Sequence, residues 1–319
     1  MRWVACCLLI GACGGKSTPE KPAPAAAVAP PAAAPTRVFE RTLRAIDVNG
    51  TRLTYRLIGD STAAPVVFVH GTLADFRAWS GQETAFAQGY RVLVYSRRYH
   101  RPNPQTSDDQ TYSPKLHAED LAAMLLTLEL PPAHIVGSSY GAYVALALAR
   151  EHPEMVRSLV LAEPPIVSLL TGSEAGDPVR RAFFATALDP ARAAFAHGDS
   201  VAAVRAYYDA ENGVGRFDNL PATARGELLG DAFELRREML ANREQYYPPI
   251  SCADLGRVTK PVLIVRGARS PQMFQLISNE LARCLQSDTT VVIPGAGHPP
   301  NGSNGAYFNQ VVLGYLASH

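Results

Sequence analysis

Ser139 is the side chain of this sequence best placed for nucleophilic chemistry, because it stands in a Gly-Ser-Ser-Tyr-Gly stretch, residues 137–141. The apolar residues 133–136 before it predict a short strand, and the Ala- and Leu-rich residues 142–150 after it predict a helix. A serine between glycines at a tight strand-to-helix turn is typical of a nucleophile elbow, in which the strained turn exposes the hydroxyl. A flexible loop is the alternative, but the flanking elements favour catalysis.

A histidine that could serve as the base lies near the carboxyl end of the chain. His298 stands in the glycine-rich residues 294–300, directly after the apolar residues 289–293. Imidazole titrates in the range in which it can take a proton from serine and later return it. We therefore expect His298 to act as general base and then general acid; the alternative is a loop histidine that caps a helix at Asn301. The other histidines considered do not follow a strand in a glycine-rich loop, as a base of this kind should: His100, His117, His134 and His152.

Strands and helices that could position these groups alternate beyond residue 36. Asn49-Gly50 joins two strand-like runs, 37–48 and 51–58, and is a strong hairpin signal. We expect further strands at 65–69, 90–95, 158–162, 261–265 and 289–293, and helices near 78–88, 115–130, 141–151, 271–285 and 305–318. Buried strands alternating with helices predict a parallel sheet covered on both faces. Residues 164–250 contain no clear strand and indicate a helical insertion.

In this order of elements the chain resembles the α/β-hydrolase family with a helical cap, over roughly residues 37–319. The resemblance is carried by the hairpin, a His-Gly pair after the third strand, the elbow, the helical insertion and a histidine loop after the last strand. It implies an α/β fold with a mostly parallel twisted sheet and helices on both faces. It also implies a core of residues 37–163 and 251–319 and a cap of residues 164–250.

The resemblance extends to the groups that would hold a developing oxyanion. His70-Gly71-Thr72 follows the third strand, and in the family the N–H after this His-Gly pair and the N–H after the nucleophile form the oxyanion hole. Here these belong to Thr72 and Tyr140, and the alternative is a plain strand-ending turn. Residues 95–100 match a further loop of the family, which we expect to shape the pocket floor; charged surface is the alternative.

The carboxylate that should orient the histidine departs from the family pattern. The family usually carries an Asp shortly after the strand that follows the cap, but Ser270 stands there, and a serine cannot hold an imidazolium by charge. Glu163 ends the strand after the elbow helix, where some family members carry their acid. A carboxylate among apolar residues needs a partner, and we expect His298 to be that partner. An arginine at the cap hinge is the alternative partner, and weaker candidates for the acid are Asp254, Glu280 and Asp288.

The amino-terminal residues predict export. Residues 1–12 have a basic start and a short apolar run, which is typical of a signal peptide and too short to span a bilayer. Ile-Gly-Ala-Cys at its end resembles the bacterial lipobox, which implies lipidation of Cys13; an ordinary signal cut near Ala12 is the alternative. Residues 13–36, rich in Ala and Pro, indicate an extended tether. We expect a lipid-anchored protein on the periplasmic side of the bacterial cell envelope. By analogy with bacterial lipoproteins, Gly14 rather than Asp after Cys13 favours the outer membrane over the inner membrane.

The composition bears on nucleic-acid binding, metal binding and cysteine pairing. With 30 Lys+Arg against 29 Asp+Glu the chain offers no electrostatic case for nucleic-acid binding. Its Cys and His spacing does not suit zinc, and we find no cofactor signature. Cys252 and Cys284 remain after signal cleavage, and an oxidising compartment permits a disulfide between them; two separate buried thiols are the alternative.

These observations together predict a serine hydrolase that cleaves a carboxylic ester or related acyl substrate through an acyl-enzyme. A lactonase, a carbon–carbon bond hydrolase or a cofactor-free perhydrolase would use the same residues with a different pocket. A helical cap usually implies a small or medium substrate in a closed pocket. An alternative of another class is a degenerate hydrolase retained as a tethered binding lipoprotein, for which Ser270 is the supporting feature.

Overall fold

A computed structural model describes residues 41–105, 111–285 and 289–319. The predicted signal peptide, the tether and Cys13 lie outside these residues, as does Asp288. None of the helices in the described ranges is both long and apolar enough to cross a membrane.

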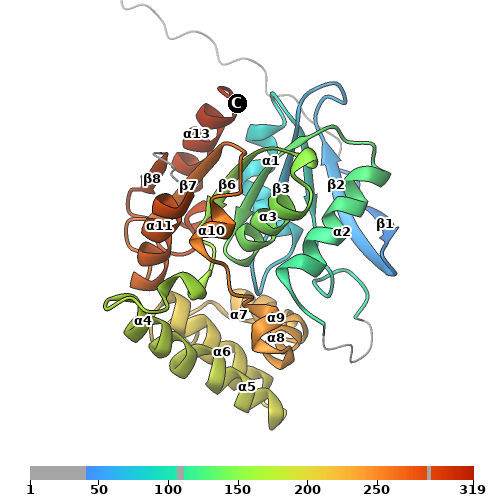
Figure 1. The fold of residues 1–319 in the computed structure, drawn as a ribbon. Helices are drawn as coiled ribbons and strands as arrows, with labels where there is room; N and C mark the ends of the chain where they lie inside the picture. Colours follow the sequence, from blue (N-terminus) through green and yellow to red (C-terminus); the bar gives the residue numbers. More distant parts are fainter. Residues whose placement is uncertain (1–40, 106–110, 286–288) are drawn as a thin grey trace, which may run out of the picture. The chain divides into compact units, whose positions relative to one another are not determined.

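The described residues form an eight-stranded sheet in the order β1-β2-β4-β3-β5-β6-β7-β8 (Figure 1). Its strands β3 to β8 are parallel, whereas β2 runs antiparallel to both β1 and β4. The predicted hairpin at Asn49-Gly50 joins β1 and β2, and both turn residues have positive φ. The bounds are β1 Arg44–Val48, β2 Thr51–Ile58, β3 Pro65–Val69, β4 Arg91–Tyr95, β5 Ala133–Ser138, β6 Val156–Ala162, β7 Val262–Gly267 and β8 Thr290–Ile293. The first strand begins at Arg44, later than the expected run 37–48.

Helices cover both faces of the sheet because successive residues of the central strands point to opposite sides. In β3, Val67 and Val69 pack with α2 and α3, while Val66 and Phe68 pack with α1 and α13. The core helices are η1 Phe76–Trp79, α1 Ser80–Phe86, α2 Pro114–Thr127, α3 Tyr140–Glu151, η2 Pro153–Met155, α10 Cys252–Leu255, α11 Gln272–Leu285, α12 Pro300–Ser303 and α13 Gly305–Leu316. The α/β fold with a mostly parallel, doubly covered sheet is therefore confirmed.

The chain between β6 and β7 is helical. Helices α4 to α9, yellow-green to orange in Figure 1, gather at one end of the sheet. Their bounds, with the shorter turns η3 and η4, are η3 Val167–Leu170, α4 Gly176–Phe183, η4 Phe184–Leu188, α5 Asp189–Ala196, α6 Ser200–Asn212, α7 Ala222–Gly230, α8 Ala232–Leu240 and α9 Arg243–Tyr246. We refer to residues 164–250 as the cap.

A disulfide joins Cys252, at the start of α10, to Cys284 near the end of α11. Their Cα atoms lie 4.8 Å apart and the two residues are separated by 32 positions. This confirms the expected pairing, and it fastens the segment that leaves the cap to the helix that follows β7.

Because the disulfide closes a loop of this length in the unfolded chain, its removal should destabilise the protein. We expect Cys252→Ser to lower the free energy of unfolding by about 2–4 kcal/mol. Urea unfolding of the oxidised protein, compared with the variant, measures the difference. Equal urea midpoints for the two proteins would contradict the prediction, and reductant should lower the midpoint of the wild type but not of the variant.

Candidate active site

The turn between β5 and α3 holds Ser139 in a strained conformation. Ser139 has φ 52° and ψ −127°, a region that residues with a side chain rarely occupy. The flanking glycines are required by close backbone contacts: a Cβ on Gly137 would lie 2.5 Å from the Ala142 Cα, and one on Gly141 would lie 2.1 Å from the Val69 carbonyl oxygen. The turn is thus the elbow that the sequence predicts.

His298 lies against the serine. Its Nε2 atom is 3.1 Å from Ser139 Oγ, and both residues are almost fully buried. The ring of Phe274, from α11, stacks on the imidazole with centroids 3.9 Å apart and planes 6° apart. Ser138 donates a hydrogen bond of 2.8 Å to the Asn301 side chain, which fastens the loop of His298 to the elbow. These contacts fix the position and the plane of the imidazole.

Glu163 lies on the other side of the imidazole. Its Oε2 atom is 2.7 Å from His298 Nδ1, and its Oε1 accepts a hydrogen bond of 2.7 Å from the Gly267 N–H. The residue is fully buried and has a positive φ of 53°, so its backbone turns sharply where β6 ends. The tautomer follows from these contacts, because a carboxylate at Nδ1 requires the proton there and leaves Nε2 free to accept the serine proton.

The other candidates for the acid are engaged elsewhere. Asp254 completes a capping box with Ser251, and Glu280 pairs with Arg283. Ser270 is buried, and its hydroxyl has no hydrogen-bond partner in the described part of the chain. The structure therefore brings Ser139, His298 and Glu163 together and leaves the usual acid position to a serine.

A second carboxylate influences the imidazole. Burial lowers the pKa of His298, but the hydrogen bond to Glu163, the charge of Glu163 and the charge of Glu211 outweigh it, so the pKa lies above its ordinary value. Glu211 is near the end of α6, and its Oε1 atom is buried without a hydrogen-bond partner among the described residues. Burial raises the pKa of Glu211, although the charge of His298 acts in the opposite direction. The cap thus brings a carboxyl group within electrostatic range of the imidazole.

The loop after β3, residues 70–75, which we call the β3 loop, passes directly against the elbow. A Cβ on Gly71 would lie 2.8 Å from the Ser139 Cβ. Thr72 follows Gly71, and Tyr140 is the first residue of α3, where a backbone N–H has no acceptor within the helix. The two predicted oxyanion donors therefore belong to segments that meet at Ser139.

Arg97, in the segment of residues 95–100, binds the β3 loop from the core side. Its fully buried guanidinium donates hydrogen bonds of 3.0 Å to the carbonyl oxygens of His70 and Gly71, and one of 2.9 Å to the Tyr112 hydroxyl. The Arg97 N–H donates to His70 Nε2. His70 is thus a structural residue of the β3 loop, and the segment is a buried support rather than charged surface.

Four further histidines contact groups other than Ser139. His134 contacts the Ser158 hydroxyl, His152 contacts Glu119, and His100 contacts the Ala74 carbonyl oxygen. His117 is buried beside Tyr112 with ring centroids 4.5 Å apart. Within the described residues, none of these imidazoles is hydrogen-bonded to Ser139.

One group could in principle hold a metal ion. Single ligand atoms of His100, Glu234 and Glu238 lie within 4.8 Å of one another, and all three residues are buried. The carboxylate oxygens are already hydrogen-bonded by protein donors, and the Arg97 guanidinium lies 3.9 Å from Glu238. A cation next to that guanidinium would be repelled, so the group is better described as a hydrogen-bond network.

Sequence reasoning missed Glu211, Glu234, Glu238 and Phe274. The two glutamates of α8 are four residues apart, which places them on one helix face. That spacing is common on exposed helices, so it could not reveal that this face is buried against the β3 loop.

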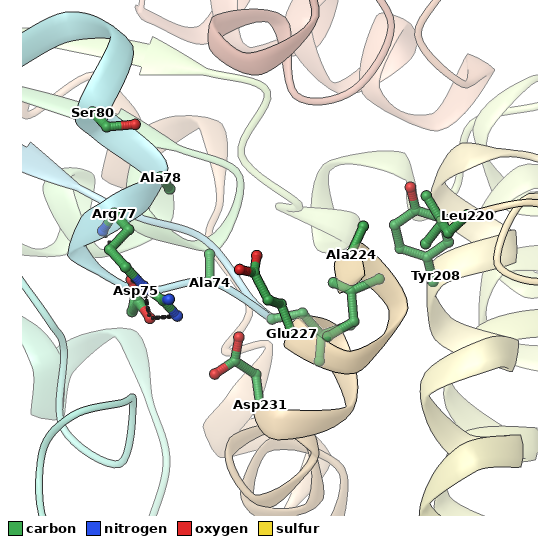
Figure 2. A pocket seen from close by; sticks show the side chains of 12 residues that line it. Ala74, Asp75, Arg77, Ala78, Ser80, Tyr208, Leu220, Ala224, Glu227 and Asp231 are labelled. Atoms are coloured by element: carbon green, nitrogen blue, oxygen red, sulfur yellow. Dashed lines mark hydrogen bonds and ion pairs between the residues drawn. The ribbon is translucent and has the colours of Figure 1, made fainter. Parts of the chain in front are cut away.

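A cavity of about 470 Å³ opens beside the β3 loop (Figure 2). One wall is made by residues 73–75, 77, 78 and 80, and the other by cap residues that include Tyr208, Leu220, Ala224, Glu227 and Asp231. The carboxylates of Glu227 and Asp231 extend toward the first wall in Figure 2. Ser139 and His298 do not line this cavity, and Leu73 is its residue nearest in sequence to the candidate oxyanion donors.

Curated relatives match part of the chain. It is 30% identical over 129 residues to the uncharacterized hydrolase YraK of Bacillus subtilis, covering 40% of this chain and 47% of that protein. It is 33% identical over 133 residues to the sn-1-specific diacylglycerol lipase ABHD11 of Mus musculus, covering 41% of this chain and 42% of that protein. The chain therefore spans less than half the length of these relatives.

Solved structures match almost the whole fold. The carboxylesterase CesB of Bacillus subtilis aligns with a TM-score of 0.67 and 18% identity, covering 88% of this chain and 93% of that one. The enol-lactonase from Burkholderia xenovorans LB400 aligns with a TM-score of 0.68 and 20% identity, covering 86% of this chain and 100% of that one. At this level of identity the matches establish the fold.

A sequence profile of the alpha/beta hydrolase family matches residues 66–311, which include the elbow, the end of β6, the cap and the loop of His298. Together with the order of the sheet and the arrangement of Ser139, His298 and Glu163, this match shows that the chain belongs to the alpha/beta hydrolase family.

Proposed function

We propose that this protein is a serine hydrolase that cleaves a carboxylic ester or a related acyl substrate through an acyl-enzyme. The observation that carries the proposal is the continuous path from Ser139 Oγ to His298 Nε2, 3.1 Å, and from His298 Nδ1 to Glu163 Oε2, 2.7 Å. A nucleophile, a base and an orienting carboxylate in this geometry are the parts that acyl transfer needs.

The chemistry follows from the positions of these atoms. Ser139 Oγ attacks the acyl carbon while His298 Nε2 takes its proton, and Glu163 stabilises the resulting imidazolium. The N–H groups of Thr72 and Tyr140 receive the oxyanion. His298 then protonates the leaving alcohol, and water deprotonated by the same imidazole releases the acid from the acyl-enzyme.

The surroundings of the site favour a small or medium substrate. Ser139 is 6% exposed and His298 is 7% exposed, so the reacting atoms lie beneath the cap and away from bulk water. Similar proteins include a diacylglycerol lipase and a carboxylesterase, which supports an ester or related acyl compound as the substrate class.

Labelling with a fluorophosphonate, which reacts with activated serines, tests the assignment on the full chain. We expect Ser139→Ala and His298→Ala to abolish labelling and to lower kcat for small esters by on the order of 10⁴-fold or more. Glu163→Gln should lower kcat by about 10³- to 10⁴-fold, because the amide cannot stabilise the imidazolium.

Ser270→Ala is the matched control, since it alters the position where the family usually carries its acid, and it should label as fast as the wild type. Fast labelling of Glu163→Gln would reject Glu163 as the acid. A folded wild type that neither labels nor hydrolyses esters would instead support the binding lipoprotein.

The pH dependence of kcat/KM should report His298, because only neutral imidazole can accept the serine proton. Since the pKa of His298 is raised, activity should be present above that raised pKa and lost as the pH falls through it. Glu211→Gln removes a negative charge that favours the imidazolium, so it should lower the pKa of His298 and move the acid limb to lower pH.

Glu227→Gln is the control for this shift, because Glu227 also belongs to the cap but is not among the groups that act on the pKa of His298. An acid limb that stays in place in Glu211→Gln, or moves equally in Glu227→Gln, would contradict the prediction.

We also propose that the protein is anchored in the bacterial cell envelope through a lipidated Cys13. The lipobox-like stretch before Cys13 supports this, and the disulfide between Cys252 and Cys284 is consistent with an oxidising compartment. Cells grown with radiolabelled palmitate should label the wild type and not Cys13→Ser, and the variant should leave the membrane fraction. Equal labelling of both proteins would reject the anchor.

A further inference from the structure

The β3 loop is held from the cap side by two buried glutamates of α8. Glu238 and Glu234 are each 1% exposed and lie one helical turn apart. Both reach across the boundary between cap and core to atoms of the β3 loop. A buried carboxylate is costly unless it is well hydrogen-bonded, so each pairing reflects a specific arrangement of donors.

Glu238 binds the side chain of the candidate oxyanion residue. The Thr72 hydroxyl lies 3.0 Å from both carboxylate oxygens of Glu238. The Tyr112 and Tyr246 hydroxyls donate further hydrogen bonds to Glu238, of 2.5 Å and 2.7 Å. Hydroxyl donors thus surround the carboxylate, and one of them belongs to the residue whose N–H would face the oxyanion.

Glu234 binds the next residue of the loop. Its Oε2 accepts a hydrogen bond of 3.1 Å from the Leu73 N–H, and Leu73 has a positive φ of 52°. On the other side, Glu234 Oε1 lies 3.2 Å from His100 Nε2. Burial and then the neighbouring Glu238 raise the pKa of Glu234, while burial and then Arg97 lower that of His100. Glu234 therefore contacts the β3 loop at Leu73 and the core at His100.

On the side opposite the cap, the core also binds the β3 loop. Arg97 donates to the carbonyl oxygens of His70 and Gly71, and its guanidinium lies 3.9 Å from Glu238. The β3 loop is therefore held between a buried cation of the core and two carboxyl groups of the cap. Because Leu73 has a conformation that residues with a side chain rarely adopt, the shape of the loop depends on these outside contacts.

We propose that Glu238 and Glu234 are positioning residues that set the Thr72 N–H in the oxyanion hole, so that the hydrolytic site is complete only when the cap is docked on the core. This inference rests on the proposed serine hydrolase function. Both glutamates would act through the β3 loop, which they contact at Thr72 and Leu73.

Thr72→Val tests the inference directly, because it removes the hydroxyl that binds Glu238 and keeps the backbone N–H. With para-nitrophenyl acetate and the full chain, we expect kcat to fall about 10- to 100-fold, less than the loss of a whole oxyanion donor, with KM little changed. Thr72→Ser, which keeps the hydroxyl, should restore kcat. Glu238→Gln should slow turnover in the same way.

The double variant Thr72→Val/Glu238→Gln shows whether the two side chains act through one contact. We expect it to be no slower than the slower single variant, whereas independent effects would multiply. This comparison also separates Glu238 from Tyr207, whose pKa Thr72 lowers against the larger effect of burial.

Glu83→Gln is the matched control, since Glu83 is a fully buried glutamate of α1 that pairs with Arg41 and Arg56. It should lower the unfolding midpoint and leave kcat unchanged. If Thr72→Val labels with fluorophosphonate and turns over as fast as the wild type, the positioning role is rejected while the hydrolase function stands. If the wild type shows no turnover that depends on Ser139, the proposed function itself fails.

Discussion

The close approach of the β5–α3 turn to strand β3 is the constraint on which the rest of the site depends. A methyl group on Gly141 would meet the Val69 carbonyl oxygen, and one on Gly71 would meet the Ser139 side chain. Since the backbones touch, the serine hydroxyl and the β3 loop share one small space at the carboxyl edge of the sheet. The imidazole, the carboxylate and the cap are arranged around that space.

The position of the acid follows from the parallel sheet. Strands β5, β6 and β7 are neighbours and end at the same edge, so a carboxylate that ends β6 can reach the imidazole as well as one placed after β7. Both strand ends take part here, because β6 supplies Glu163 and β7 supplies the Gly267 N–H that binds it. Ser270 is therefore compatible with a complete set of groups.

The cap supplies carboxyl groups close to His298 and to the β3 loop. Glu211 brings a negative charge within range of His298, and Glu234 and Glu238 bind the β3 loop. The buried Glu238 carboxylate is tolerated because the Tyr112 and Tyr246 hydroxyls donate hydrogen bonds to it and the Arg97 guanidinium lies 3.9 Å away. Cap and core are consequently joined by polar contacts between α8 and the β3 loop.

The fold class could be predicted from the sequence, because strand periodicity is a local signal, and the structure confirms it. Glycine spacing also predicted the elbow, whereas His298 and Glu163 were chosen with the help of the family resemblance. The structure places Ser139, His298 and Glu163 side by side. The helical character of residues 164–250 was equally readable, whereas β1 begins later than the apolar pattern indicated. Only the tertiary structure decided which cap residues face the site. Glu211 and Glu238 lie on ordinary amphipathic helices, and their direction depends on how those helices pack, which no local pattern encodes.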